Sequence, residues 1–149
     1  MGEAETPAAP RSNWTYDEDR DEMRGTSTRF ASVRSLNNVP VNWPYTAAPA
    51  TLHVRHRSTD GLNIFITIDG QFTCRQYRDQ TVAVKFDDGP IQQFRCGEAD
   101  GGGSDMLFIL AETRFLNAMK EAEKVTIELP VYEIGPTQMT FPVAGLEWE

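Results

Sequence analysis

The sequence predicts a mainly β protein, an antiparallel β-sandwich or half-open barrel of about seven to nine strands with one packed α-helix. Three observations support this fold class. Apolar and polar residues alternate in several short stretches, turn-forming Gly, Pro and Asp separate these stretches, and a single stretch carries apolar residues at helical spacing. With 149 residues, of which 40% are hydrophobic, the chain can bury a core of its own, so we expect one domain over residues 14–149.

The clearest predicted element is a hairpin over residues 51–68. In its first strand Leu52 and Val54 alternate with polar side chains, and the turn signal Asp60-Gly61 follows. The second strand, residues 62–68, has the most apolar face in the sequence, formed by Leu62, Ile64, Ile66 and Ile68.

Further strands are expected wherever the alternation returns, over residues 14–17, 26–35, 81–86, 106–110, 124–133 and 139–143. Residues 37–50 hold three prolines, which exclude a helix and favour an extended crossing over the surface. The one helix is expected over residues 112–123, because four apolar residues fall there on a single stripe: Phe115, Leu116, Met119 and Ala122.

The two cysteines lie in the segment 69–96, around which we expect the fold to be organised. Phe72 shares a strand parity with Cys74, and Phe94 with Cys96, so each sulfur is expected beside an aromatic ring on a core-facing side. This placement favours a disulfide between neighbouring strands over two free thiols. Closing a loop of this size stabilises a fold by roughly 3 kcal/mol in the chain-entropy model, and a disulfide indicates an oxidising compartment.

A metal site is not expected. Cys74 and Cys96 are not accompanied by a second cysteine pair, so no zinc-ligand spacing is met. His53 and His56 are three positions apart on a predicted strand and therefore face opposite sides of the sheet.

The net charge of −8 argues against a nucleic acid or an anionic membrane as the main partner. The charge is uneven, since residues 26–96 carry 5 acids and 8 bases whereas residues 97–149 carry 10 acids and 3 bases. Arginine supplies 11 of the 14 basic residues, which reflects either genomic composition or a binding patch. The candidate patch consists of Arg55, Arg57, Arg75 and Arg78.

An aromatic pair in the proline-rich segment, Trp43 and Tyr45, is a second candidate for a binding surface. Aromatic residues in a proline-constrained loop either form a ligand platform or cover one end of the sandwich. Both interpretations are consistent with the sequence.

No catalytic constellation is complete, and we expect neither an enzyme nor a cofactor. The adjacent carboxylates Asp87 and Asp88 precede Gly89-Pro90 and are interpreted as turn residues, because neighbours at a strand end point to opposite sides. The glycine run 101–103 is not followed by the Lys-Ser/Thr of a phosphate-binding loop.

The N-terminal residues 1–13 are polar and rich in Ala and Pro, as in a tether that follows a cleavage site or a lipid anchor. No apolar run reaches the roughly 18 residues of a membrane span. We therefore expect a mature exported domain, periplasmic or associated with the envelope, with membrane contact only through a removed or lipidated N-terminus.

Several short motifs make the chain resemble the small exported β-rich proteins related to the type VI secretion-associated VasI/TagO family. The motifs are Trp14 ahead of an acidic stretch and Met23, Leu52-x-Val54-Arg55, the run from Val82 to Pro90, a lone helix near Phe115, and Phe141-x-x-x-Gly145-Leu146. His56 stands where that family commonly has a cysteine, so the disulfide arrangement differs. The resemblance implies an envelope-located accessory protein, and it supplies no site residues.

These observations favour a non-catalytic exported binding or accessory module whose partner is another envelope protein, and which is a monomer or a weak dimer. The alternative is an acidic inhibitor or immunity protein that uses the negative C-terminal third against a basic enzyme such as a cell-wall hydrolase.

Overall fold

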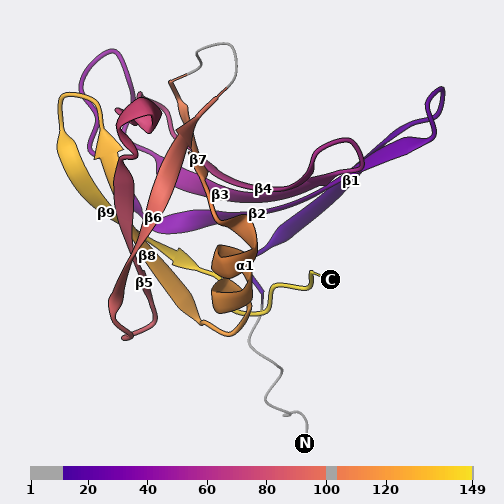
Figure 1. Cartoon of the computed structure of the whole chain (residues 1–149). Coiled ribbons are helices and arrows are strands. Elements are labelled where there is room, and N and C mark those ends of the chain that lie inside the picture. Colours follow the sequence, from indigo (N-terminus) through magenta and orange to yellow (C-terminus); the bar gives the residue numbers. More distant parts are fainter. Residues whose placement is uncertain (1–11, 100–103, 149) are drawn as a thin grey trace, which may run out of the picture.

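The computed structural model describes residues 12–99 and 104–148, and it confirms the mainly β class (Figure 1). Nine antiparallel strands form one sheet in the order β1-β2-β3-β4-β7-β6-β5-β8-β9. The strands are β1 (Thr15–Asp21), β2 (Thr26–Asn38), β3 (Pro49–Arg57), β4 (Gly61–Thr67), β5 (Thr81–Phe86), β6 (Ile91–Glu98), β7 (Met106–Ile109), β8 (Lys124–Val131) and β9 (Gly135–Pro142). The helices are α1 (Glu112–Lys120) and a short 3₁₀ helix, η1 (Gln76–Arg78).

The sheet curls over on itself at β6. The end of β6 pairs with β7, whereas its beginning pairs with β5, so this strand joins a layer of β1–β4 and β7 to a layer of β5, β8 and β9. The curl brings the edge strand β9 against β2, and the architecture is a half-open barrel. The first layer crosses behind the second in Figure 1.

Alternation decides which face of each strand is buried. Along β8 every second residue is almost completely buried, and the residues between them face outward, as the sequence predicts for a strand with one face on the core. The predicted hairpin is also confirmed, because Leu52 pairs with Ile66 and Val54 with Ile64 on the inner face.

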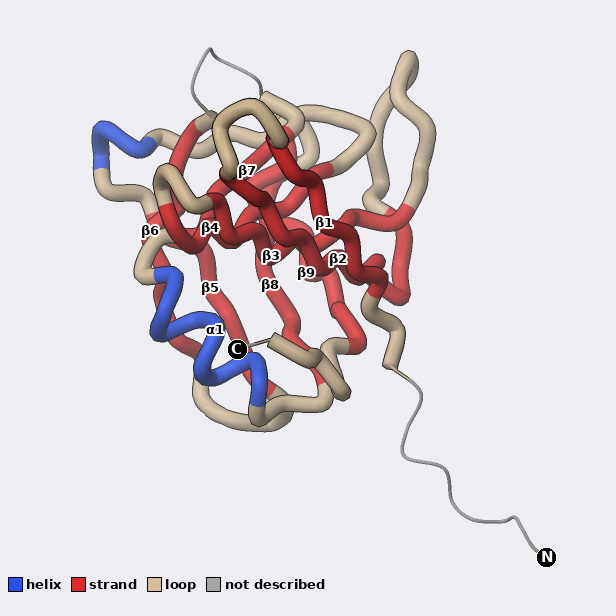
Figure 2. The backbone as a smooth tube through the Cα atoms, turned by 90° about the vertical axis from the view of Figure 1, so that its right-hand side faces the viewer, coloured by secondary structure: helices blue, strands red, loops and turns tan. Residues whose placement is uncertain are grey.

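The helix α1 packs at one end of the curled sheet, as Figures 1 and 2 both show. Its Phe115 is fully buried and makes edge-on contacts with Phe86 and Phe94 at centroid distances of 5.4 and 5.3 Å. The helix ends at Lys120, three residues before the predicted end, although Ala122 is still buried as expected.

The cysteine segment corrects one prediction and confirms another. The sulfurs of Cys74 and Cys96 are bonded at 2.05 Å, as predicted. Cys74, however, does not lie on a strand, because only Phe72 forms a bridge, to Val131. The amide of Phe72 donates to Ser104 and the amide of Thr73 to Pro130, so consecutive backbone groups bond to different segments and no ladder develops.

At the N-terminus, the predicted tether lies outside the described residues except for Ser12 and Asn13. Trp14 is buried and donates its indole N–H to the carbonyl of Val143 at 2.9 Å, which attaches the start of β1 to the end of β9. The hairpin of β1 and β2 then projects away from the body of the protein (Figure 1).

Candidate functional site

The six predicted binding residues do not form one surface. Trp43 and Tyr45 lie in the loop before the first residue of β3, whereas Arg57 is its last residue. A strand of nine residues is about 27 Å long, so the aromatic pair and the strand arginines lie at opposite ends of β3. Arg75 precedes η1 and Arg78 is its last residue, beside the end of β6.

The aromatic pair belongs to what we call the aromatic end, consisting of Trp43, Tyr45 and Tyr132. Gln71 connects two of these residues, because its side-chain amide donates to the Tyr45 hydroxyl at 2.7 Å and its carbonyl accepts from the Tyr132 amide at 2.8 Å. Trp43 has 92% of its surface exposed and Tyr132 53%. Of the two interpretations of Trp43, the structure therefore excludes the one in which it covers the core.

A second region, which we call the outer groove, crosses the outward face of β3, β4, β7 and β6. It has a volume of about 190 Å³ and is lined by Arg55, Arg57, Asp60, Asn63, Gln76, Gly97, Glu98, Phe108, Leu110 and Glu112. The strand register brings these residues together. His53 pairs with Phe65, Phe65 with Phe108, and Phe108 with Gly97, so one row of outward-facing positions crosses four strands.

Aromatic rings support Arg55 at one side of the outer groove. Its guanidinium carbon lies 5.0 Å from the ring centroid of Phe65 and 5.9 Å from that of Phe108, distances typical of cation–π contacts. Phe65 is only 4% exposed although it lies on the outward face, because Arg55, Phe108 and His53 cover it. Arg55 Nη2 donates to Asn63 Oδ1 at 2.9 Å, while its buried Nε has no hydrogen-bond partner in the described part of the chain.

Burial also lowers the pKa of two basic side chains in this region. Desolvation lowers the pKa of His53, whose ring stacks on Phe65 at 4.7 Å and contacts the Thr67 hydroxyl at 2.9 Å, and the charge of Arg55 adds to the effect. Desolvation likewise lowers the pKa of Arg55, and so does the positive charge of Arg57, which is ion-paired with Asp60.

The opposite wall of the outer groove is η1, held against β6. The amide of Gln76 donates to the Glu98 carboxylate at 3.2 Å, and the amide of Glu98 donates to Gln76 Oε1 at 2.9 Å. Next to this pair a Cβ at Gly97 would lie 3.1 Å from Leu110 Cδ2, a tight contact, so a side chain there would require Leu110 to shift. The disulfide attaches the same wall to β6 from the core side.

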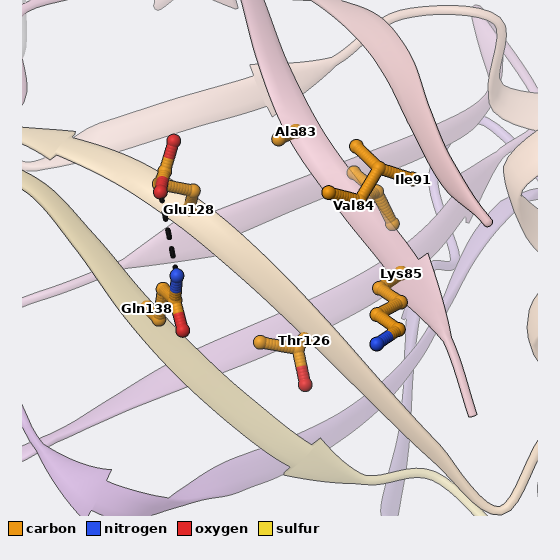
Figure 3. Close-up of a pocket in the computed structure, with 7 residues that line it drawn as sticks. All are labelled: Ala83, Val84, Lys85, Ile91, Thr126, Glu128 and Gln138. Carbon is orange, nitrogen blue, oxygen red and sulfur yellow. Dashed lines mark hydrogen bonds between the residues drawn. The ribbon is translucent and has the colours of Figure 1, made fainter. Parts of the chain in front are cut away.

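A third depression, of about 230 Å³, lies on the outward face of β5, β8 and β9 (Figure 3). Its floor is mainly apolar, and Ile91 at its rim is exposed. Lys85 and Glu128 come from neighbouring strands and stand apart in the view, and Glu128 accepts a long hydrogen bond of 3.5 Å from Gln138.

The predicted turn role of Asp87 is supported by its contacts. Its Oδ1 accepts hydrogen bonds from the backbone amides of Glu123 at 2.9 Å and Lys124 at 3.0 Å, which connects the β5–β6 turn to the start of β8. Asp88 points into solvent. Over residues 12–99 and 104–148 no three His, Cys, Asp or Glu side chains are grouped so as to hold a metal ion, and no helix there is long and apolar enough to cross a membrane.

Several residues of both regions were missed by sequence reasoning. Phe65 and Asn63 lie opposite the strongly apolar face of β4, so nothing local distinguishes them from ordinary outward residues. Gln76 and Glu98 are 22 positions apart and meet only because the disulfide and β6 bring them together. Tyr132 could have been found, since it directly follows the alternating strand that ends at Val131.

Comparison of the chain with protein-family models, with curated proteins and with solved structures found no match.

Proposed function

We propose that this protein is a non-catalytic exported module that binds a partner protein through the aromatic end. The observation that carries the proposal is Trp43, an almost fully exposed indole on a loop that hydrogen bonds hold in place. Exposed tryptophan and tyrosine side chains grouped on a fixed surface are typical of the residues that contribute most to protein–protein binding. An envelope protein of a secretion system is the partner class that the family resemblance suggests.

The loop that carries Trp43 is anchored at several points. The amide of Val39 donates to Ala48 at 2.9 Å across the base of the loop, and the amide of Thr46 donates to the Asp69 carboxylate at 2.9 Å. A loop that is ordered before binding loses less conformational entropy when a partner docks. This anchoring favours binding over a role as a flexible linker.

The disulfide supports an oxidising compartment, since such bonds persist mainly outside the cytosol. Within that range we propose the periplasm or the outer envelope. Labelling of free thiols in intact cells and in lysed spheroplasts tests the location, because a cytosolic protein would present Cys74 and Cys96 in reduced form.

The test of the aromatic end uses the double variant Trp43→Ala/Tyr132→Ala and the control Ile91→Ala. Ile91 is also an exposed apolar residue, but it lies beside the β5–β6 turn at the other end of the sheet. We expect a partner captured by the wild type from envelope extract to be retained by the control and lost by the double variant. A partner retained equally by all three proteins would place the binding surface elsewhere.

A second candidate function, inhibition of a basic enzyme, is favoured by the exposure and the acidic charge of β1 in the β1–β2 hairpin. Every residue of β1 is exposed except Asp21 at its end, and four of its seven residues are acidic. The acids of the C-terminal third, in contrast, are spread over α1, β8 and several loops. Lysozyme-type hydrolases should be inhibited at low salt and released as salt is raised; inhibition that charge-reversal of Asp17 and Asp19 to Lys leaves unchanged would exclude this hairpin.

A further inference from the structure

The outer groove contains charges of both signs that do not neutralise each other. Arg55 and the carboxyl-bearing residues Glu98 and Glu112 are among the residues that line it. Among the described residues Arg55 makes no ion pair, and neither Glu98 nor Glu112 is within 4.0 Å of a cationic side chain. The remaining pair of charges, Arg57 and Asp60, is already matched.

The strand order explains why these charges stay apart. Arg55 projects from β3, whereas Glu112 begins α1 just after β7, and β4 lies between β3 and β7. Glu98 continues the core-facing positions of β6, since it pairs with the buried Leu107, and its carboxylate already accepts a hydrogen bond from the Gln76 amide. Two steps of about 4.8 Å separate β3 from β7 by about 10 Å, and Arg55 and Glu112 line one common space without forming an ion pair. Gly97 and Phe108 form the floor of that space.

Arg55 also has hydrogen-bonding capacity that the protein does not use. Its Nη2 is bonded to Asn63, its Nε has no partner in the described residues, and its guanidinium is fixed in place by Phe65. Buried polar atoms without a partner are rare in proteins, and each one points to an unseen water, an ion or a functional role. A guanidinium held rigidly on aromatic rings is suited to planar recognition of a carboxylate.

We infer that the outer groove binds a small zwitterionic ligand, with its carboxylate at Arg55 and its ammonium group at Glu112. The volume of about 190 Å³ limits the ligand to the size of an amino acid or a dipeptide, because drug-sized ligands need about 300 Å³ or more. The acidic side of the groove disfavours phosphates and dicarboxylates. This inference concerns a different surface from the aromatic end and does not rest on the proposed function.

Three matched probes test the inference on the full chain: glycylglycine, N-acetylglycylglycine, which lacks the ammonium charge, and glycylglycinamide, which lacks the carboxylate. In a titration followed by amide NMR shifts, glycylglycine should move the Gly97 amide and the Asn63 side-chain amide. Each blocked peptide should bind about tenfold more weakly, the effect expected for loss of one charge-assisted contact. Equal binding of all three peptides, or no shift at Gly97 and Asn63, would overturn the inference.

Two variants test the contacts of the ligand's ammonium group and of its carboxylate separately. Glu112→Gln removes a half-buried carboxylate at the start of α1 and should make glycylglycine bind as weakly as its acetylated form. Arg55→Lys retains the charge but loses the planar fork, and should weaken glycylglycine without changing its preference over the acetylated form. Arg34→Gln, which removes an exposed arginine of β2 outside the groove, is the control. Unchanged affinity in Glu112→Gln, with its fold intact, would contradict the assignment.

Discussion

The side chain of Asn37 in β2 substitutes for a strand neighbour of Thr140 in β9. Its Oδ1 accepts from the Thr140 amide at 3.1 Å, and its Nδ2 donates to the carbonyl of Gln138 at 2.9 Å. One amide side chain thus satisfies a donor and an acceptor on the edge of β9 that β8 does not occupy. It closes the barrel at the point where the register between β2 and β3 is irregular, between Arg34 and Asn38.

We predict that Asn37→Ala lowers the free energy of unfolding by about 1 kcal/mol, because two solvent-accessible hydrogen bonds are lost. The Thr140 amide should lose protection in hydrogen exchange, whereas amides of β3 should not. Asn38→Ala, at the neighbouring exposed position, serves as the control and should leave both quantities unchanged. If the Thr140 amide exchanges equally slowly in Asn37→Ala, the Asn37 contact does not hold β9 against β2.

The disulfide should contribute measurably to stability. Cys74 and Cys96 are separated by 22 positions, and the loop-closure model assigns roughly 3 kcal/mol to a crosslink of that size. We expect Cys74→Ala/Cys96→Ala, or reduction of the wild type, to lower the urea midpoint accordingly. The double variant should itself be insensitive to reductant, and a wild type whose midpoint does not change on reduction would contradict the prediction.

The two adjacent carboxylates of the β5–β6 turn should differ in their effect on stability. Asp87 accepts two backbone hydrogen bonds from the start of β8, and its main chain has a left-handed conformation with φ of 52°. Asp87→Ala removes the oxygen that accepts both hydrogen bonds and should cost about 1–3 kcal/mol, whereas Asp88→Ala should change stability by less than about 0.5 kcal/mol. Thermal melts of the two variants provide the measurement. Equal melting temperatures would show that the turn does not depend on this contact.

Sequence periodicity predicted most of the fold because nearly every strand has one face on the core. Leu52 and Val54 are buried and alternate with outward residues, so the hairpin followed from local sequence alone. The same argument failed at Phe72 and Cys74, where the alternation results from one bridge and one disulfide without a strand between them. A period of two residues does not reveal whether the backbone groups in between have a ladder partner.

The candidate sites were predicted less well, because they depend on which strands become neighbours. Arg55 was identified as a surface arginine, but its role follows from Phe65 and Phe108, which reach it only through the pairing of β3 with β4 and of β4 with β7. Trp43 and Arg57 were predicted on two candidate surfaces, and local sequence did not show that the length of β3 separates them. The strand register and the strand order decide which side chains become neighbours, and neither can be read from local composition.

Stability should decrease as the pH falls below about 6.5, and His53 should be the cause. Burial against Phe65 and the charge of Arg55 lower the pKa of His53 in the folded state below the unfolded value of 6.5. Between these two pKa values the unfolded chain takes up a proton that the folded protein does not, so protonation favours unfolding. The contribution is fully present above the unfolded pKa and is lost as the pH falls toward the folded one, with a slope of at most about 1.4 kcal/mol per pH unit. Urea unfolding at about pH 7.5 and about pH 5.5 should show this loss in the wild type and in His56→Gln, whose imidazole lies on the other side of β3. It should be absent in His53→Gln, and an equal loss in that variant would assign the pH dependence to other groups.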